Sequence, residues 1–155
     1  YAKEYGMNIC IARPYNAYGP RDDFHPDTSH VISALIRRVE EGQNPLVVWG
    51  SGTASRSFLY VDDFARGLLE VTENSPQVGA INLGSDEETS ISDLAHQIVK
   101  ISGRKTDIIF DSKKPDGQPR RCCDTTLGKQ LIGFKAKVPL EEGLFRTIEW
   151  YRNNH

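Results

Sequence analysis

The stretch "NICIARPYNAYGPRDDFHPDTSHVISALIRRVEE", residues 8–41, contains a strand signal, a long loop and a helix signal in succession. The apolar run "NICIA" predicts a buried strand. We expect this strand to stop before Pro14, because proline has no N–H to donate to a neighbouring strand. From Ser29, the expected N-cap, apolar side chains recur at helical spacing. The connection between them, residues 13–30, exceeds the usual length, which is typical of a functional loop.

Strand-like runs and amphipathic helices alternate along the rest of the chain. Strands are expected in "PLVVWG", "SFLYV", "AINLG" and "DIIF", and helices in "DDFARGLLEVTEN", "SISDLAHQIVKISG" and "PLEEGLFRTIEWYRNN". This alternation indicates the α/β class. A second segment, residues 111–121, is rich in turn formers and charge, so it is the other candidate for a functional loop.

The composition predicts a soluble globular protein. With 155 residues the chain is long enough for one domain with a real core, so we expect residues 1–155 to form a single domain. The charges of its 19 basic and 21 acidic side chains nearly cancel, so no overall electrostatic field favours nucleic acid or a membrane as a partner. The chain shows neither a secretory signal nor a run of membrane length, so we expect a cytoplasmic location.

The cysteines indicate reduced thiols. Cys10, Cys122 and Cys123 are odd in number, and the adjacent pair has poor geometry for a bridge. No Cys/His spacing matches a zinc site, so we predict no metal.

Several fragments, taken in order, resemble one enzyme family: "EYGMNICIARPYNAYGP", "TSHVISALIRRV", "VVWGSGTASRSFLYVDDFARGLL", "AINLGSDEETSISDLAHQIV", "DGQPRR" and "PLEEGLFRTIEWYR". They are similar to the C-terminal half of the extended short-chain dehydrogenases/reductases, the NAD-dependent epimerase/dehydratase family, which epimerise, dehydrate or reduce nucleotide sugars. The segment "SHVISALIRR" most resembles the GDP-fucose synthase branch of that family. The resemblance covers essentially the whole chain. It implies the substrate-binding portion of a Rossmann-type enzyme that uses NAD or NADP and a nucleotide-diphosphate sugar.

The motifs that such enzymes use for the dinucleotide and for hydride chemistry are absent. No tyrosine of this sequence is followed by lysine four positions later, and "GSG" at residues 50–52 lacks the third glycine. We therefore expect the chain alone to bind no NAD or NADP and to transfer no hydride. The strands expected at residues 8–13 and 80–84 would join the absent part of the Rossmann sheet, so their edges would be exposed. A rearranged fold or a homodimer would cover them.

Two other interpretations stay open at this point. The chain could be a stand-alone, non-catalytic module that binds nucleotide sugars or serves in assembly, or a truncated remnant. The missing half could also lie on another chain, have been removed from this stretch, or be absent from the gene.

Asn16 follows a strand end, where ligands gather in open α/β sheets. The resemblance implies that Asn16 contacts the sugar nucleotide, and that Pro14 and Tyr15 border the nicotinamide. From spacing alone, Asn16 could instead cap the turn before Gly19.

His30 is expected in the first turn of a helix, where a protonated imidazole is disfavoured and a neutral ring is favoured. The resemblance implies that His30 is the acid/base that reprotonates a sugar carbon, paired with a cysteine of the absent half. A solvated histidine is the alternative. Asp62 and Asp63 are expected to be the N-cap and a first-turn acid of the next helix, not catalytic carboxylates.

Arg38 lies near the helix face of Val31 and Leu35, so its stem should follow the apolar stripe with its head at the rim, while Arg37 points elsewhere. The resemblance implies that Arg38 binds the diphosphate and that Val31, Leu35 and Trp49 flank the nucleotide base. The alternative is that Val31, Leu35 and Trp49 are ordinary residues of the hydrophobic core.

Arg56 and Arg121 are expected on separate loops. The resemblance implies that they converge on the pyrophosphate, and two cations suit a ligand with two negative phosphates. Solvated loop charges are the alternative.

Overall fold

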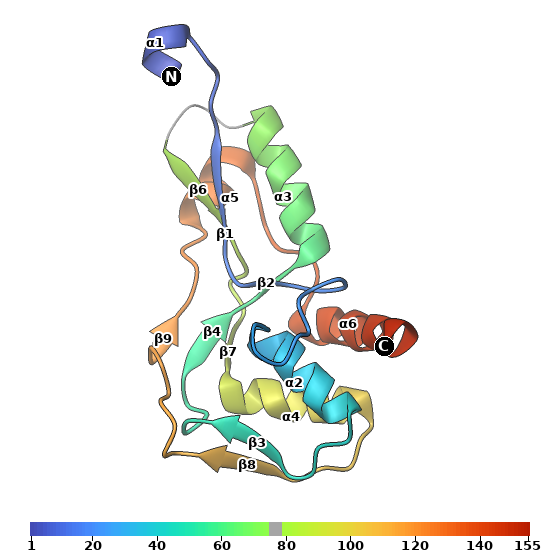
Figure 1. Ribbon diagram of the computed structural model, residues 1–155. Helices are drawn as coiled ribbons and strands as arrows, with labels where there is room; N and C mark the ends of the chain where they lie inside the picture. The colour runs from blue at the N-terminus through green and yellow to red at the C-terminus, as the bar shows by residue number, and fades with distance from the viewer. Residues whose placement is uncertain (75–78) are drawn as a thin grey trace.

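Small sheets and helices alternate along an elongated chain, with the N-terminal helix at one tip (Figure 1). The computed structural model describes residues 1–74 and 79–155. The elements in chain order are α1 (Ala2–Tyr5), β1 (Ile11–Pro14), β2 (Ala17–Tyr18), α2 (Val31–Glu40), β3 (Leu46–Trp49), β4 (Ser55–Ser57), β5 (Leu59–Tyr60), α3 (Val61–Asn74), β6 (Ala80–Leu83), β7 (Glu88–Ser90), α4 (Ile91–Ser102), β8 (Ile108–Asp111), β9 (Arg120–Arg121), α5 (Thr126–Ile132) and α6 (Leu140–Asn154).

Most strand pairs are parallel. Strand β1 pairs with β6, β2 with β5, and β3 with β8, each in parallel. Strand β4 lies between β7, its antiparallel partner, and β9, its parallel partner. The predicted α/β class is confirmed.

Two hydrophobic clusters fill the interior. The large core joins α2, α4 and α6 to the strands beside them, and its fully buried members include Ile36, Ile98 and Leu144. The small core lies where α3, β6 and the segment after α5 meet, and consists of Leu59, Val71, Ile81, Leu83 and Phe134. In Figure 1 the helices of the large core, α2, α4 and α6, lie in the lower part of the molecule, and α3, β6 and α5 lie in the upper part.

Three predicted helices are confirmed to within a residue or two. In α4 the Ser90 hydroxyl accepts the Asp93 N–H, and Gly103 ends the helix with φ 68°. Glycine adopts this left-handed conformation without the steric cost that a side chain would add. Helices α3 and α6 follow the apolar periodicity in the same way.

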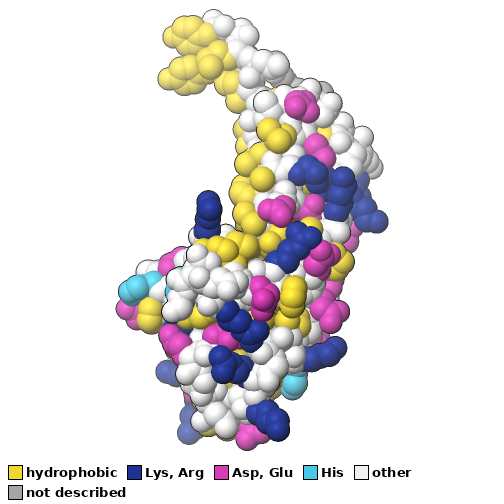
Figure 2. Space-filling view, turned by 90° about the vertical axis from the view of Figure 1, so that its right-hand side faces the viewer, with side chains coloured by type: hydrophobic (Ala, Val, Ile, Leu, Met, Phe, Trp, Pro, Cys, Tyr) yellow, Lys and Arg dark blue, Asp and Glu magenta, His cyan; other side chains and the backbone are white. Residues whose placement is uncertain are grey.

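The first strand differs from its prediction. It begins at Ile11 instead of residue 8, includes Pro14, and is largely exposed, with Ile11 at 52%. In the described ranges β1 pairs with β6 alone, so its other edge has no strand partner. Exposed apolar side chains continue towards the N-terminus, and Figure 2 shows hydrophobic atoms gathered at that tip. The expected burial was wrong, and the expected exposed edge is confirmed.

Helix α2 begins one residue later than predicted. Its N-cap is His30, whose carbonyl accepts the N–H of Ala34 at 2.8 Å. Ser29 does not cap the helix, because its buried Oγ accepts no hydrogen bond within the described residues, and its N–H donates to the carbonyl of His25 in a preceding turn. His30 therefore lies at the junction of loop and helix instead of inside the first turn.

The run "SFLYV" is not one strand. Residues 57–61 are divided between the end of β4, all of β5 and the start of α3. Because α3 begins at Val61, Asp62 is not its N-cap, although Asp62 and Asp63 both lie in its first turn, as predicted. Asp63 is buried and accepts the N–H groups of Lys137 and Val138, both at 2.8 Å. This carboxylate is structural.

Candidate functional site

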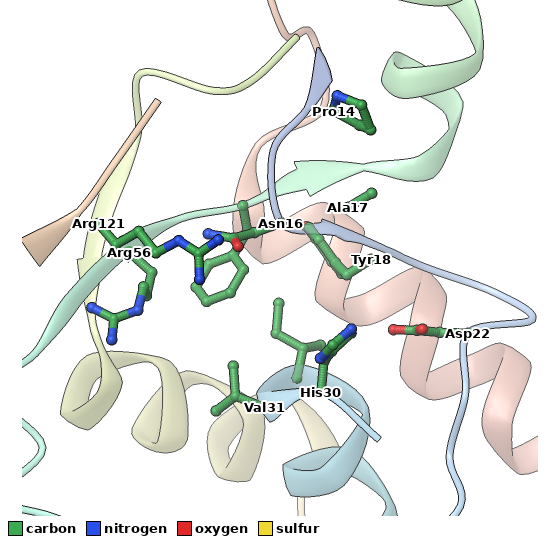
Figure 3. A pocket seen from close by; sticks show the side chains of 11 residues that line it. Pro14, Asn16, Ala17, Tyr18, Asp22, His30, Val31, Arg56 and Arg121 are labelled. Carbon is green, nitrogen blue, oxygen red and sulfur yellow. The ribbon is translucent and has the colours of Figure 1, made fainter. Parts of the chain in front are cut away.

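A pocket of about 430 Å³ opens where the end of β1, the loop after β2, the start of α2 and the β4–β9 pair come together (Figure 3). Eleven side chains line it: Pro14, Asn16, Ala17, Tyr18, Asp22, His30, Val31, Ile32, Arg56, Phe58 and Arg121. We call it the first pocket. It brings together six of the predicted site residues, from segments as far apart in sequence as β1 and β9.

Arg56 and Arg121 are direct neighbours. Arg56 lies on β4 and Arg121 on β9, and the two residues are paired in register across the parallel ladder. The expectation of separate loops was wrong, but the two arginines do lie side by side, as the resemblance implies. Side chains at paired positions of adjacent strands point to the same face, so the pairing itself directs both guanidinium groups towards the first pocket (Figure 3).

Each arginine of this pair is held in a different way. The Nη1 atom of Arg56 donates to the carbonyls of Ser55 and Gln118, both at 2.7 Å. The guanidinium of Arg121 lies over the ring of Tyr15, 5.8 Å from its centroid. A guanidinium has five donors in a fixed fork, so both groups keep donors for an anion.

Asn16 links the end of β1 to β4, the strand that carries Arg56. It adopts φ 44°, which is uncommon for a residue with a side chain, and its Nδ2 donates to the carbonyl of Ser57 at 2.8 Å. Its own carbonyl accepts the N–H of Leu59 at 3.2 Å. The side chain thus binds across to β4 instead of capping the following turn, and it lines the first pocket beside Pro14.

Two titratable side chains lie across the pocket from the arginines. His30 reaches it from the N-cap of α2, and Asp22 from the loop that precedes α2 (Figure 3). Asp22, Tyr18 and Phe58 were not predicted as lining residues.

A second pocket, of about 580 Å³, adjoins the first and shares Val31 and Arg56 with it. Leu35, Arg38 and Trp49 line this second pocket, so it contains the remaining predicted residues except Tyr15. Leu35 also belongs to the large core, Val31 packs against it, and Trp49 is 65% exposed. Trp49 is therefore not an ordinary core residue. The centroid of its ring lies 5.2 Å from the Lys114 ammonium.

Arg38 lies at the rim of the second pocket. Its Nε donates to Gln43 at 2.6 Å and its Nη2 donates to the carbonyl of Val47. Burial lowers the pKa of Arg38, and the neighbouring Arg37 lowers it further. Arg37 also borders this pocket while pairing with Glu41 at 2.7 Å, so the expectation that it points elsewhere was wrong.

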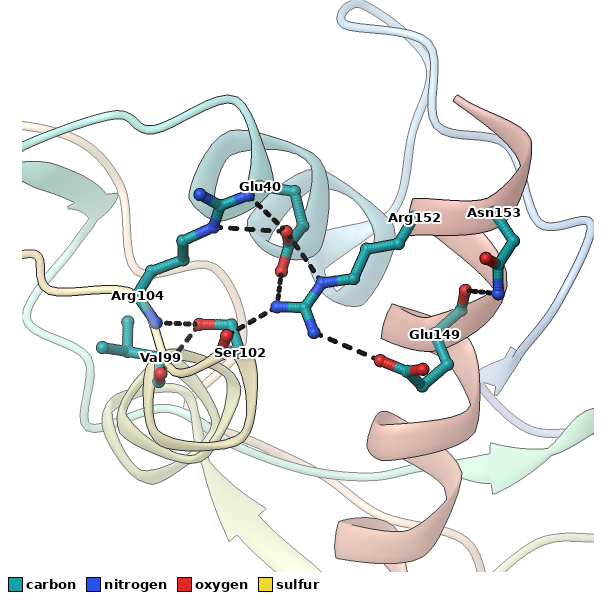
Figure 4. Close-up of polar contacts among 7 residues, drawn as sticks. All are labelled: Glu40, Val99, Ser102, Arg104, Glu149, Arg152 and Asn153. Atoms are coloured by element: carbon teal, nitrogen blue, oxygen red, sulfur yellow. Dashed lines mark hydrogen bonds and ion pairs between the residues drawn. The ribbon is translucent and has the colours of Figure 1, made fainter.

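The far end of α2 is held by an ion-pair network (Figure 4). Glu40, with its side chain only 4% exposed, pairs with Arg152 of α6 at 2.8 Å and with Arg104 after α4 at 3.1 Å. Arg152 also donates to the carbonyl of Ser102 at 2.5 Å. Helices α2 and α6 and the residue Arg104, which follows α4, are thereby joined at one carboxylate. The helix that begins after His30 and carries Val31 and Arg38 is fixed at the end opposite the first pocket.

Residues 1–84 match the NAD dependent epimerase/dehydratase family. The chain belongs to this family. It is 40% identical over 158 residues to probable GDP-L-fucose synthase 1 of Oryza sativa subsp. japonica, a match that covers 99% of this chain and 48% of that protein. It is 42% identical over 167 residues to the GDP-L-fucose synthase of Escherichia coli (strain K12), covering 99% and 52%.

Solved structures of the family have the same fold. A GDP-L-fucose synthetase from Naegleria fowleri bound to NADP matches with a TM-score of 0.90 at 30% identity, over 99% of this chain and 50% of that one. The UDP-glucose 4-epimerase of Thermotoga maritima with UDP-glucose matches with a TM-score of 0.88 at 29% identity, over 98% and 48%. The chain spans about half the length of the relatives it matches.

The cysteines of this family member are free thiols, as predicted. Burial raises the pKa of Cys123 to about 11, with a further increase from Asp124 and Asp86. Burial and Glu88 also raise the pKa of Cys122. No cysteine lines the first pocket among the described residues, so none of them lies beside His30.

Residues 1–74 and 79–155 contain neither a metal-binding cluster nor a membrane-spanning helix. No group of three or more His, Cys, Asp and Glu side chains gathers there in a way that could hold a metal ion. Every helix in these ranges is too short or too polar to cross a lipid bilayer.

Proposed function

We propose that the chain is the nucleotide-sugar-binding portion of an NAD(P)-dependent epimerase or reductase, and that its ligand is a GDP-sugar. The register pair of Arg56 and Arg121 carries this proposal, because two cations on neighbouring strands face one pocket together with Asn16 and His30. The relatives named GDP-L-fucose synthase support guanine as the base.

The two adjoining pockets suit the two ends of such a ligand. The diphosphate would lie at Arg56 and Arg121, within reach of Arg38 at the rim of the second pocket. The sugar would enter the first pocket, where Asn16 has an amide to contact it. The base would occupy the second pocket, where Val31, Leu35 and Trp49 offer apolar surface.

Binding is tested by isothermal titration with GDP, UDP and dTDP and with their sugars. We expect saturable binding that is tightest for the guanine nucleotides. Arg121→Gln should weaken the binding of GDP about tenfold, because it removes a charge-assisted contact. Arg120→Gln is the matched control, since Arg120 is the neighbour on β9 and pairs with Glu88 at 2.8 Å.

The outcomes separate this function from its rivals. Equal losses in the Arg120 and Arg121 variants would mean that the pocket does not bind the phosphates. Absence of saturable binding for every nucleotide sugar would leave an assembly module or a remnant.

Catalysis would need groups that this chain does not carry. In the family, hydride chemistry belongs to NAD or NADP. Here Pro14 at the pocket edge and Tyr15 under Arg121 could contact only the border of a nicotinamide. We propose that the chain alone binds no dinucleotide, and that His30 acts as acid/base only when a complementary half is present. Oxidation of NADPH by the purified chain with a GDP-keto sugar would contradict this.

The unpaired edge of β1 supports a partner. We propose that the rest of the family's sheet covers this edge in a complete enzyme and that a second copy covers it otherwise. Sedimentation at increasing concentration should show self-association of the chain. A monomer at the highest concentration would overturn the second part of the proposal.

A further inference from the structure

Asp22 has a distinctive position in the first pocket. It is the one carboxylate among the eleven lining residues, and Figure 3 shows its carboxylate pointing towards His30, on the opposite side of the pocket from Arg56 and Arg121. The pocket therefore has a cationic side and an anionic side.

Local hydrogen bonds fix Asp22 in this position. Its N–H donates to the carbonyl of Gly19 at 3.2 Å, and its Oδ1 accepts the N–H of Asp23 at 2.8 Å. Within residues 1–74 and 79–155, its Oδ2 accepts no hydrogen bond and forms no ion pair. Asp23 differs, because its two oxygens accept the Thr28 hydroxyl and the N–H of His25. Asp23 holds the loop together, and Asp22 is left to face the pocket.

The backbone supports the same assignment. Arg21, immediately before Asp22, adopts φ 67°. In the described part of the chain, the other non-glycine residue in the left-handed region is Asn16, which also lines the first pocket. Such conformations cost free energy and persist where surrounding contacts enforce them, commonly at ligand sites.

We infer that Asp22 is a specificity-determining residue that accepts hydrogen bonds from hydroxyl groups of the sugar. A carboxylate repels phosphate and accepts from hydroxyl donors, so it favours the sugar end of the ligand. The two arginines favour the diphosphate end. Together these opposed charges fix the direction in which a nucleotide sugar enters the pocket. This inference rests on the proposed function, because it requires the diphosphate at Arg56 and Arg121.

The test compares GDP with GDP-L-fucose, since both contain ribose and only the second carries a fucosyl group, the sugar at issue here, on its terminal phosphate. For each protein, the ratio of the two dissociation constants isolates the contribution of the sugar. Asp22→Ala should weaken the binding of GDP-L-fucose about tenfold or more, because it removes a hydrogen bond to a charged acceptor, and should leave GDP within about twofold. Asp22→Asn keeps one acceptor oxygen and the bond to the Asp23 N–H, so its loss should be smaller.

Glu73→Ala is the matched control, because it removes an exposed carboxylate near the end of α3, which is not a lining residue of either pocket. Thermal unfolding of each variant verifies the fold, and the Asn variant provides the test if the Ala variant is unfolded. Equal ratios in the wild type and both Asp22 variants would overturn the inference while the proposed function stands. If the wild type binds neither ligand, the proposed function fails and this inference fails with it.

Discussion

The region around the large core and the region around the small core are built differently. Among the described residues, the large core contains seventeen that are buried, three helices pack on it, and Glu40 joins α2 to α6 and to Arg104 after α4. The small core contains five, and its strand β1 is exposed along one edge. Both pockets lie beside the large core. The region that contains the two pockets is thus supported by its own interior, whereas the other region has the form of part of a sheet.

The largest expected effect comes from a truncation in the large core. Ile98→Ala should lower the free energy of unfolding by about 2–5 kcal/mol, because Ile98 is fully buried and the change leaves a cavity. Ile11→Ala in β1 should cost less than about 1 kcal/mol, because half of that side chain is already in water. Urea unfolding measures both. Equal losses would contradict the comparison and would mean that β1 is covered.

Removing the charge at Glu40 should have the next largest effect. Glu40→Gln should cost about 1–3 kcal/mol, because two arginines lose a nearly buried negative charge and one of its two acceptor oxygens, although water around Arg104 moderates the loss. Glu142→Gln is the control, because its pair with Arg146 is half-exposed and should contribute less than about 0.5 kcal/mol. Denaturant unfolding compares the two variants. A smaller loss at Glu40 than at Glu142 would show that the three helices do not depend on this network.

A pH-dependent effect is expected at the seam between the two regions, where Asp63 of α3 accepts two N–H groups of the segment before α6. Burial alone would raise the pKa of Asp63, but hydrogen bonds from Arg66, Val138 and Lys137 outweigh it, so the pKa lies below its ordinary value of 3.8. The stabilisation is therefore present above pH 3.8 and is lost as the pH falls through the folded-state pKa.

The seam is tested by the pH dependence of unfolding. The difference in unfolding free energy between wild type and Asp63→Asn should shrink as the pH falls below 3.8. Asp62→Asn is the control, because Asp62 is the exposed neighbour of Asp63. A difference that stays constant with pH would contradict the role of the ionised carboxylate.

The smallest effect is expected at the N-terminal tip. Helix α1 has four residues and buries none of them, and Tyr5 is 64% exposed although it stacks on Tyr1. Tyr5→Ala should change the unfolding free energy by less than about 0.5 kcal/mol, as for most surface substitutions. A thermal scan that showed a loss above 1 kcal/mol would indicate that this tip packs on the rest of the chain.

The sequence predicts the elements that carry their own local signals. Helix α4 has a serine before it, a glycine after it and apolar residues in the correct period, so its bounds were predictable. Strands β2 and β9 have two residues each, too few for any period to be visible. The start of α2 was misplaced because Ser29 has the side chain of a good cap but its backbone belongs to a turn.

The candidate site was predictable to a different extent. Arg56 and Arg121 were found through the family resemblance, since no local pattern predicts the pairing of strands so far apart in sequence. The length of the connection at residues 13–30 marked that loop as unusual. It could not distinguish Asp23, which holds the loop together, from Asp22, which faces the pocket, because their difference lies in the hydrogen bonds around them.

The pairing of Arg56 with Arg121 also determines when the site is assembled. During synthesis, the first arginine leaves the ribosome long before its partner, and the β4–β9 ladder cannot close until residue 121 has emerged. Contacts between distant segments form slowly, because a long loop must close before they contribute. If the two arginines bind a diphosphate as proposed, that capacity is acquired late in folding. A nucleotide-binding assay accordingly reports whether the chain has completed its fold, as well as whether the ligand fits.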